Sequence, residues 1–399
     1  MIMKKGHPRV GHAGFVIFLL ILGNALLHIN QAEFLSHRYG ELTELQLSLF
    51  DTTLYAAYLI TGLFWGWSMS KSGRRTPFAV SGAALSAVIL FIQPWLPGFG
   101  FMLVLRFVHG AVFIAAWQSL LTLILDYSMD GNRGRNMGIF GLFMALGMGT
   151  GPVLGGVLAE WGDAVPYYTA SALHAIAMLW AWISLKEASG QYEKPALKES
   201  LFLAARKPLL WIPAMVNFVD RFHMGFILFA LPLFIRDVLN LSPIYRGLLL
   251  GVNALAYIIL QYPIGRLSDR FGRMTFLIIG SSGYGLLLMG AGILGQWGLV
   301  PLALCFFALG ICSGLSGPPN SALVGDLVAP AENPAASAFF NFAGNWGMFM
   351  GPLFAGLTIG SLGYTPAFML AGAVELASLA VVLLGIKSLG KKRSRNQPQ

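Results

Sequence analysis

The sequence is poor in charged residues and in cysteine. Only 11% of its 399 residues are Asp, Glu, Lys or Arg, whereas soluble domains carry about a quarter. This shortage excludes a soluble enzyme or a nucleic-acid-binding protein, since such proteins need charged surfaces to stay in water. The two cysteines, Cys305 and Cys312, lie in one apolar stretch, so they form no disulfide framework and indicate no redox compartment.

Motifs for nucleotides and metals are also missing. No segment matches G-x-x-x-x-G-K-[ST], so ATP is not the expected energy source. The seven histidines are not spaced beside cysteines or carboxylates as zinc ligands are. We therefore expect no enzyme activity, no cofactor and no metal site.

Apolar sequence is abundant instead, at 56% of residues with a mean hydropathy of +0.68. Runs long enough to cross a bilayer core of about 30 Å recur along the whole chain. They lie near 13–36, 45–69, 76–96, 99–125, 137–160, 164–185, 209–235, 244–265, 275–296, 298–325, 335–360 and 364–387. These runs predict an all-α polytopic membrane protein with twelve transmembrane helices, the first of which is retained and not cleaved as a signal peptide.

The basic residues predict the orientation. With the N-terminus inside, most of the 26 Lys and Arg residues fall on the cytoplasmic side, and only Arg38, Arg236 and Arg246 fall outside. This is the positive-inside rule, and it predicts that both termini are cytoplasmic. The net charge of +9 then needs no nucleic-acid partner, and the basic tail from Lys387 to Arg395 suits contact with anionic lipid.

The chain divides into two halves joined by a charged segment. We expect an N-terminal half at 1–186, a cytoplasmic linker at 187–208, and a C-terminal half with a basic tail at 209–399. An apolar stripe in the linker predicts a short helix lying on the inner membrane surface, with a plain linker as the alternative. The stripe consists of Leu197, Leu201, Phe202 and Ala205.

The two halves repeat each other. Gly110, Asp126, Gly147, Gly151, Pro152 and Gly156 recur 200 residues later, and Gly66 and Gly73 recur 199 residues later. Each half contains an even number of spans, so both share one orientation and the repeat is parallel. This architecture predicts alternating access to a site between the halves.

A loop motif gives the chain a resemblance to the major facilitator superfamily. Gly265 to Arg273 reads GRLSDRFGR and fills every fixed position of that family's G-x-L-x-D-R-x-G-R signature, including Asp269, Arg270 and Gly272. The first half keeps Gly66, Gly73 and Arg74, but Ser70 replaces the acidic residue. The resemblance implies the twelve-helix fold of two six-helix halves. It also implies that the carboxylate locks a cytoplasmic gate, so Ser70 predicts a weaker lock in the first half.

Two further patterns extend the resemblance. Arg106 to Gly110 resembles the family's R-x-x-Q-G pattern, with His109 in place of Gln. Gly147 to Gly156 matches G-x-x-x-G-P-x-x-G-G, including Gly151, Pro152 and Gly155, a pattern typical of the superfamily's proton-driven exporters. Close helix packing and a gating bend at Pro152 remain alternative roles for these glycines.

Ionisable residues inside spans are candidates for proton coupling, because charge in hydrocarbon is costly. Asp220 lies near the middle of its span and shares a helical face with Asn217 and Arg221. By resemblance, spans one, four, seven and ten line the central cavity, so this face would lie there. A structural contact with another helix is the alternative.

A second set of ionisable residues lies in the outer half of the first spans. Arg106 needs a counter-charge, and either Asp51 or Glu33 is placed to provide it. A plain ion pair and a protonation switch are both open for Arg106, and His109 is a candidate relay. Glu375 also lies mid-span, but the resemblance places span twelve at the periphery, so we rank it low.

Uncharged polar residues form further stripes. Pro318-Pro319-Asn320 is expected to interrupt the helical hydrogen bonds of its span and free carbonyl groups. The cavity candidates are amides, phenols and one imidazole, with interhelical hydrogen bonding as the alternative for each. They are Asn24, His28, Gln31, Tyr55, Tyr58, Asn217, Asn253, Tyr257, Gln261, Asn320, Asn341 and Asn345.

These features predict a secondary active transporter in the cell membrane, which is the inner membrane if the source is bacterial. The leading hypothesis is proton-coupled efflux of a small neutral, zwitterionic or amphipathic solute by a monomer. An importer or uniporter of such a solute is the alternative with the same fold. A transporter-like receptor or scaffold that no longer cycles is the alternative of another class.

Overall fold

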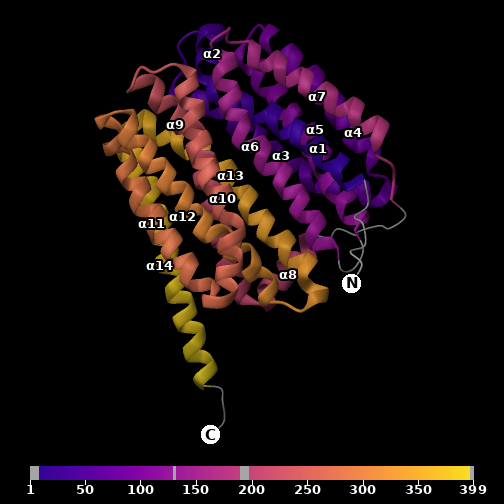
Figure 1. The fold of residues 1–399 in the computed structure, drawn as a ribbon, viewed down its shortest axis with the longest axis vertical. Coiled ribbons are helices and arrows are strands. Elements are labelled where there is room, and N and C mark those ends of the chain that lie inside the picture. Colours follow the sequence, from indigo (N-terminus) through magenta and orange to yellow (C-terminus); the bar gives the residue numbers. More distant parts are fainter. Residues whose placement is uncertain (1–8, 129–131, 189–196, 396–399) are drawn as a thin grey trace. The chain divides into compact units, whose positions relative to one another are not determined.

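A computed structural model of the chain describes residues 9–128, 132–188 and 197–395, with no side-chain detail for residues 133 and 386–395. Lys4 and Lys5, which were expected on the cytoplasmic side, lie outside the described residues. So do the middle of the expected linker and the side chains of the basic tail. All regular structure in the described ranges is helical (Figure 1).

The first half of the chain contains six long helices and one short one. They are α1 (Arg9–Leu26), α2 (Gln31–Tyr39), α3 (Glu44–Ser72), α4 (Thr76–Ile92), α5 (Phe99–Asp126), α6 (Arg133–Ala159) and α7 (Val165–Ser184), with 3-10 turns η1 (Leu27–Ile29) and η2 (Gln93–Trp95).

The second half begins with the short helix α8 (Leu197–Arg206) and then repeats six long helices. These are α9 (Trp211–Asp237), α10 (Pro243–Phe271), α11 (Arg273–Leu294), α12 (Leu299–Asp326), α13 (Asn333–Leu362) and α14 (Tyr364–Arg395), with 3-10 turns η3 (Pro208–Leu210), η4 (Gly295–Trp297) and η5 (Pro330–Glu332). Ten helices of the described chain are long and apolar enough to cross a membrane. With α7 and α13 they make the expected twelve, as two parallel six-helix halves.

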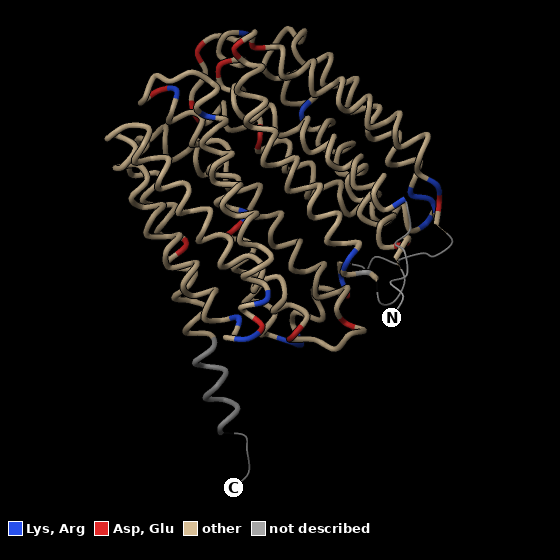
Figure 2. The backbone as a smooth tube through the Cα atoms, viewed as in Figure 1, with Lys and Arg blue, Asp and Glu red and all other residues tan. Residues whose placement is uncertain are grey.

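The chain groups into two compact units, Met1–Lys194 with Leu231–Gly251, and Pro195–Ala230 with Val252–Gln399. In the first unit, α1 packs against α6 and α7, while α4 packs against α5 and α7. In the second unit, α11 packs against both α12 and α14, and α8 packs against α13. Charged residues gather toward helix ends and are sparse along helix middles (Figure 2), which suits helices surrounded by lipid.

Glycines bring pairs of helices into close contact. The backbone of Gly151 lies against Ala25 of α1, and Gly155 lies against Leu26. In the second unit, Gly347 and Gly351 of α13 lie against the backbone of α9. A Cβ at any of these positions would collide with the neighbouring helix, so the contacts favour the packing interpretation of the span-five pattern.

The first predicted span is not one helix. The range 13–36 was expected to be continuous, but α1 ends at Leu26, a 3-10 turn follows, and α2 begins at Gln31. Buried Asn30 lies at the break with φ −121° and ψ 10°, and its side chain donates to the backbone carbonyl of Asp163 at 3.0 Å. A side-chain bond to a neighbouring segment competes here with the helical ladder.

The signature segment is mostly helix, where a loop was expected. Helix α10 continues to Phe271, and only Gly272, with φ +93°, departs from it. Nothing between Gly265 and Phe271 disfavours a helix, whereas the left-handed conformation at Gly272 suits glycine alone. Gly73, with φ +64° and ψ 8°, ends α3 in the left-handed helical conformation.

The two prolines at 318 and 319 do not break α12, which runs unbroken through them. The prediction concerned the helical hydrogen bonds and not a break in the helix. The prolines still supply no N–H groups, so the carbonyls of Gly314 and Leu315 lose their usual partners four residues ahead.

Helix α8 confirms the short helix predicted in the linker. Its buried face consists of Ser200, Leu203 and Ala204, and Leu203 and Ala204 belong to an apolar cluster with Ala336 and Phe339 of α13. Leu201 and Phe202 of the predicted apolar stripe are exposed. The stripe therefore faces away from the protein, and its contact with a membrane surface remains a prediction.

Candidate functional site

Asp51 of α3 is the centre of a buried polar cluster in the first unit. It is fully buried and accepts a hydrogen bond from Gln31 Nε2 at 2.6 Å. His28 Nδ1 lies 3.4 Å from its Oδ1, and Arg106 Nη2 lies 3.6 Å from the same oxygen. The break after α1 places His28 and Gln31 at this carboxylate, so two residues predicted to line a substrate cavity belong to the Asp51 cluster.

Arg106 of α5 is also fully buried, and its guanidinium lies 4.0 Å from the centre of the Phe50 ring. Its Nη1 lies 3.1 Å from Nδ1 of His109. Arginine can only donate, so His109 Nδ1 must accept, and its Nε2 carries the hydrogen. The proton position on His109 is thus fixed by its neighbour.

The hydrogen bonds continue from His109 to α7. His109 Nε2 lies 2.7 Å from Ser86 Oγ, and Ser86 Oγ lies 2.8 Å from His174 Nδ1. His174 Nε2 lies 3.0 Å from the backbone carbonyl of Leu20, which can only accept. Ser86 therefore accepts from His109 and donates to His174, and both imidazoles are neutral in this arrangement.

Glu33 does not pair with Arg106. Its two carboxylate oxygens accept from Nη1 and Nη2 of Arg246, at 2.7 and 2.8 Å. The separate helix α2 carries Glu33 away from the Asp51 cluster, so of the two predicted partners only Asp51 lies beside Arg106. Arg246 is buried, and the sequence did not indicate that it would be.

The remaining cavity candidates of the first unit lie together. Asn24 Nδ2 donates to the Tyr58 hydroxyl at 3.2 Å. The rings of Tyr55 and Tyr58 meet edge to face, with centroids 5.6 Å apart. The predicted stripes on spans one and two therefore form one polar patch.

In the second unit, the face around Asp220 is only loosely engaged. Asn217 Nδ2 donates to the carbonyl of Phe340 at 2.8 Å, and Arg221 Nη1 lies 3.6 Å from the sulfur of Met224. Within the described part of the chain, no hydrogen bond or ion pair joins Asp220 to Arg221. A tight ion pair between Asp220 and Arg221 therefore has no support in the geometry.

A further cluster lies one turn along α9. His223 Nδ1 is 3.2 Å from Glu375 Oε2 of α14, and both side chains are buried. His223 Nε2 lies 2.8 Å from the carbonyl of Ala371, and the Tyr284 ring lies 5.1 Å from the imidazole. We did not single out His223 from the sequence, although its position three residues after Asp220 puts both on one helical face.

The other cavity candidates of the second unit are scattered. Asn253 donates to the carbonyl of Phe306, Gln261 to the Tyr257 hydroxyl, and buried Asn320 to the carbonyl of Pro213. Asn341 and Asn345 are exposed on α13. These contacts within the unit fit the interhelical or local hydrogen bonding that was the alternative for each.

The signature residues form ion pairs at one end of each helical half. Arg273 binds both carboxylate oxygens of Asp326, and its Nη1 lies 3.1 Å from Asp269. Arg270 lies over the ring of Phe271, and nothing approaches Gly265 closely.

The first half uses a neighbouring arginine at this place. Arg75 is buried with its Nε 3.6 Å from Asp126, while the predicted Arg74 is exposed. Gly66 lies within α3. Asp126 and Asp326 are 200 residues apart, so both halves keep an arginine–aspartate pair here even though Ser70 replaces the signature acid.

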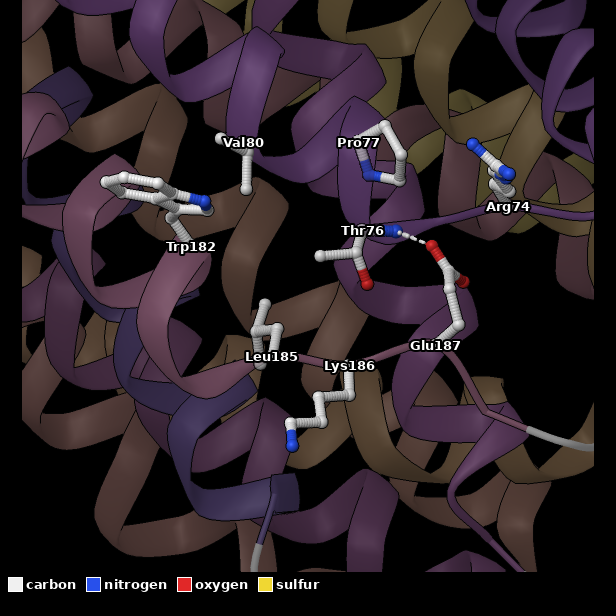
Figure 3. A pocket seen from close by; sticks show the side chains of 8 residues that line it. All are labelled: Arg74, Thr76, Pro77, Val80, Trp182, Leu185, Lys186 and Glu187. Carbon is white, nitrogen blue, oxygen red and sulfur yellow. Dashed lines mark hydrogen bonds between the residues drawn. The ribbon is translucent and has the colours of Figure 1, made fainter.

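Glu187 adds an anchor that the sequence did not reveal. Its carboxylate accepts from the backbone N–H of Thr76 at 2.7 Å and of Arg75 at 2.9 Å, at the start of α4 (Figure 3). A carboxylate there satisfies otherwise unpaired N–H groups and suits the positive end of the helix dipole. Thr76 and Glu187 line a surface pocket together with Arg74, Pro77 and Trp182.

Near this anchor, Tyr127 donates to the carbonyl of Lys186. Partial burial raises the pKa of the Tyr127 hydroxyl above its ordinary value, so it stays a donor at neutral pH. Taken together, the buried clusters combine carboxylate, imidazole, guanidinium and hydroxyl groups. Among the described residues, no group of three or more His, Cys, Asp or Glu side chains could bind a metal ion.

Comparison with known proteins agrees with this architecture. The family model described as Major Facilitator Superfamily matches residues 13–219 and again 214–399. The MFS-type transporter YfkF of Bacillus subtilis is 27% identical over 320 residues, covering 77% of this chain and 78% of that protein. The quinolone resistance protein NorA of Staphylococcus aureus is 23% identical over 390 residues, covering 96% and 97%. The class G tetracycline resistance protein of Vibrio anguillarum is 26% identical over 350 residues, covering 85% of each chain.

Solved structures show the same fold. A bacterial homologue of the human lysosomal transporter Spinster, in an inward-facing and occupied conformation, superposes with a TM-score of 0.79 at 13% identity, covering 95% of this chain and 96% of the other. The nucleoside transporter NupG gives a TM-score of 0.78 at 13% identity, with 96% and 100% covered. The family model spans nearly the whole chain in two copies, so this multi-pass membrane protein belongs to the major facilitator superfamily, whose members transport small molecules.

Proposed function

We propose that the protein is a proton-coupled exporter of small organic solutes that works by alternating access in the cytoplasmic membrane, with both termini inside. Its similarity to a quinolone and a tetracycline resistance protein supports export of amphipathic compounds. The parallel repeat supports alternating access. The patch of Asn24, Tyr55 and Tyr58 supports a solute with hydrogen-bonding groups and little charge.

The contact between Arg106 and His109 is the observation that carries the proposal. Arg106 Nη1 occupies the one lone pair through which His109 could take up a proton. Protonation of His109 therefore requires Arg106 to withdraw, and the carboxylate of Asp51 already lies 3.6 Å from its other terminal nitrogen. His109 therefore cannot take up a proton while Arg106 keeps its present position.

Proton binding at His109 would therefore change the contact between two helices. Arg106 and His109 lie on α5, whereas Asp51 lies on α3. When the proton arrives, the guanidinium gains by moving closer to Asp51, which changes the contact between α3 and α5. A ligand shifts a conformational equilibrium only through such a difference in contacts.

The proposal is tested in proteoliposomes with tetracycline and a quinolone as probes. An imposed proton gradient should drive either probe against the direction of proton flow. His109→Gln is a sharp variant, because the amide can accept from Arg106 and donate to Ser86 but cannot take up a proton. It should abolish gradient-driven movement and leave gradient-free probe exchange intact.

Two outcomes would count against the proposal. Wild-type probe exchange that ignores the proton gradient would indicate a uniporter. Absence of any movement of either probe, in protein that is folded and monodisperse, would remove drug-like solutes from the substrate class.

A further inference from the structure

We propose that His223 and Glu375 form a second proton-binding site, in the second repeat, which exchanges its proton with Asp220. This inference rests on the proposed proton coupling and adds a site for it. Neither residue belongs to a sequence pattern that resembles the family. Glu375 ranked low from sequence because the family places its span at the periphery, yet its side chain is buried and directed at an imidazole.

The geometry implies that the pair holds one proton between its two members. The Ala371 carbonyl, 2.8 Å from His223 Nε2, can only accept, so Nε2 carries a hydrogen. His223 Nδ1 then lies 3.2 Å from Glu375 Oε2. Both atoms are buried and no other hydrogen bond reaches either of them in the described structure, so a proton between them is the arrangement that satisfies both. The shared proton is therefore on Nδ1 as an ion pair or on Oε2 as a neutral pair, and the total charge is zero in both forms.

Asp220 is placed to receive this proton. Residues three apart on a helix are neighbours on its surface, and Asp220 precedes His223 by three. When the proton moves from the pair to the carboxylate of Asp220, the pair gains one negative charge and Asp220 becomes neutral. The total charge of the cluster stays constant, so the transfer avoids the cost of creating net charge in hydrocarbon.

Other titratable groups around the pair are few. Arg221 on α9 directly follows Asp220 in the sequence, and the ring of Tyr284 on α11 lies tilted to the imidazole, with centroids 5.1 Å apart. Cys305 and Cys312 on α12 lie near Tyr284. Among these described groups only Arg221 is a cation, and a nearby cation favours a deprotonated carboxylate. Withdrawal or approach of this arginine therefore sets where the proton lies.

The corresponding place in the first repeat lacks this property. His174 there accepts from Ser86 and donates to a backbone carbonyl, so its hydrogen bonds are complete without a carboxylate. No acidic side chain faces it in the described contacts. This position of the first repeat therefore holds no proton shared with a carboxylate in the described contacts.

The test is nitrogen-15 NMR of protein labelled at histidine, in lipid nanodiscs, titrated with acid and base. The proton itself is the probe, so no transport is needed. The His223 signal is assigned by its loss in His223→Gln. In the wild type, its Nδ1 should show a shared proton whose position changes with pH. Asp220→Asn removes the carboxylate that exchanges the proton, so it should move the midpoint of that change by at least about one pH unit. One unit corresponds to about 1.4 kcal/mol of interaction.

Variants separate the site from a merely structural contact. Glu375→Gln keeps a donor for Nδ1 and should convert His223 to a neutral acceptor at every pH. Glu332→Gln, which alters an exposed carboxylate of the same repeat, should leave the signal unchanged. An Nδ1 signal that is the same in wild type and Asp220→Asn would overturn the exchange, and one unaffected by Glu375→Gln would overturn the site.

Transport adds an arm that distinguishes this inference from the proposed function. In proteoliposomes, Glu375→Gln should lose gradient-driven movement of tetracycline while retaining gradient-free exchange. If the wild type itself shows no coupling, the proposed function fails regardless of the NMR result. If the wild type couples and Glu375→Gln couples equally well, this inference fails alone.

Discussion

The two repeats place polar side chains at the same three-helix contact but give them different chemistry. Gly82 of α4 lies against Val112 and Ala116 of α5, and Gly280 of α11 lies against Cys312 and Ser316 of α12. Ser86 and Tyr284 each follow four residues later. Gly162 and Gly363 both have positive φ, and His174 and Glu375 each follow twelve residues later.

The third member of each set lies on the first helix of its repeat. Gly147 contacts the carbonyl of Phe18, and Gly347 contacts the carbonyl of Phe218. Gly23 and His223 each follow those phenylalanines by five residues. The sets Gly23–Ser86–His174 and His223–Tyr284–Glu375 are thus equivalent in position.

This comparison shows that one scaffold supports two kinds of polar core. In the first repeat every hydrogen bond has a fixed direction, from Arg106 through His109 and Ser86 to His174. In the second repeat one proton can lie either on His223 Nδ1 or on Glu375 Oε2. We infer that the hydrogen-bond chain of the first repeat links protonation of His109 to the position of Arg106, while the pair in the second repeat stores a proton.

The largest expected effect concerns Asp220. Asp220→Asn should abolish proton-driven transport and change the free energy of unfolding by less than about 1 kcal/mol, since no tight ion pair is broken. Gradient-driven tetracycline transport and chemical unfolding, measured on the same preparation, check both parts. A well-folded variant with normal coupling would leave the coupling to the first repeat alone, to His109, Glu33, Asp51 and Arg106.

The next effect compares the two membrane arginines. Arg106→Met leaves buried Asp51 without its arginine and should lower the free energy of unfolding by about 3–5 kcal/mol. Arg221→Met, the matched change in the second repeat, should cost less than about 1 kcal/mol. Chemical unfolding in detergent, followed by tryptophan fluorescence, measures both, and equal losses would contradict the contrast between the repeats.

A smaller effect is expected at the signature segment. Asp269→Asn removes a partly exposed partner of Arg273, so it should slow transport about twofold to fivefold, the equivalent of about 0.4–1 kcal/mol. Ser70→Ala at the corresponding place has no charge to remove and should leave the rate unchanged. Initial rates of tetracycline transport check this, and a large loss from both variants would refute the asymmetry.

The smallest effect is at the junction of α8. Lys207 donates to Glu332, and this hydrogen bond holds the pKa of the Glu332 carboxyl below its ordinary value. A lowered pKa means that the contact stabilises the fold above the ordinary carboxyl pKa and is lost as pH falls through the lowered one. Lys207→Gln should raise the Glu332 pKa back toward its ordinary value, as carbon-13 NMR of the carboxyl would show.

The control for this last change is again in the other repeat. Asn132 stands 200 residues before Glu332, so the first repeat has no carboxyl to titrate there. Asn132→Gln should produce no acid-range change in the spectrum. A Glu332 pKa that is the same in wild type and Lys207→Gln would show that the pair does not form in solution.

The fold was predictable because its signals are long and redundant. Twelve apolar runs and an offset of 200 residues each reveal the repeat without knowledge of any contact. Element ends were less predictable, since the break at Asn30 depends on the carbonyl of Asp163, which is distant in sequence. The extension of α10 to Phe271 was missed because signature residues were taken for a loop.

The clusters were predictable only in part. A charged residue stands out in an apolar span, so Asp51, Arg106 and Asp220 were found from the sequence. The sequence could not decide between Asp51 and Glu33 as the partner of Arg106, because the separate helix α2 was not predicted. Ser86 and His174 gave no signal, because a lone polar residue in an apolar run has meaning only once its neighbours are known. The offset of 200 residues pairs His174 with Val374 and not with Glu375, so the equivalence of His174 and Glu375 emerged only from their common distance to Gly162 and Gly363 in the structure.

The glycine at position 23 limits how far the two halves can be interchanged. Its missing side chain leaves room for the His174 ring, which would lie 2.8 Å from any added Cβ. A histidine at position 23 would collide with this imidazole, so the first half cannot take up the arrangement of the second by that single change. Residues transplanted singly from one half to the other will therefore be poorly tolerated.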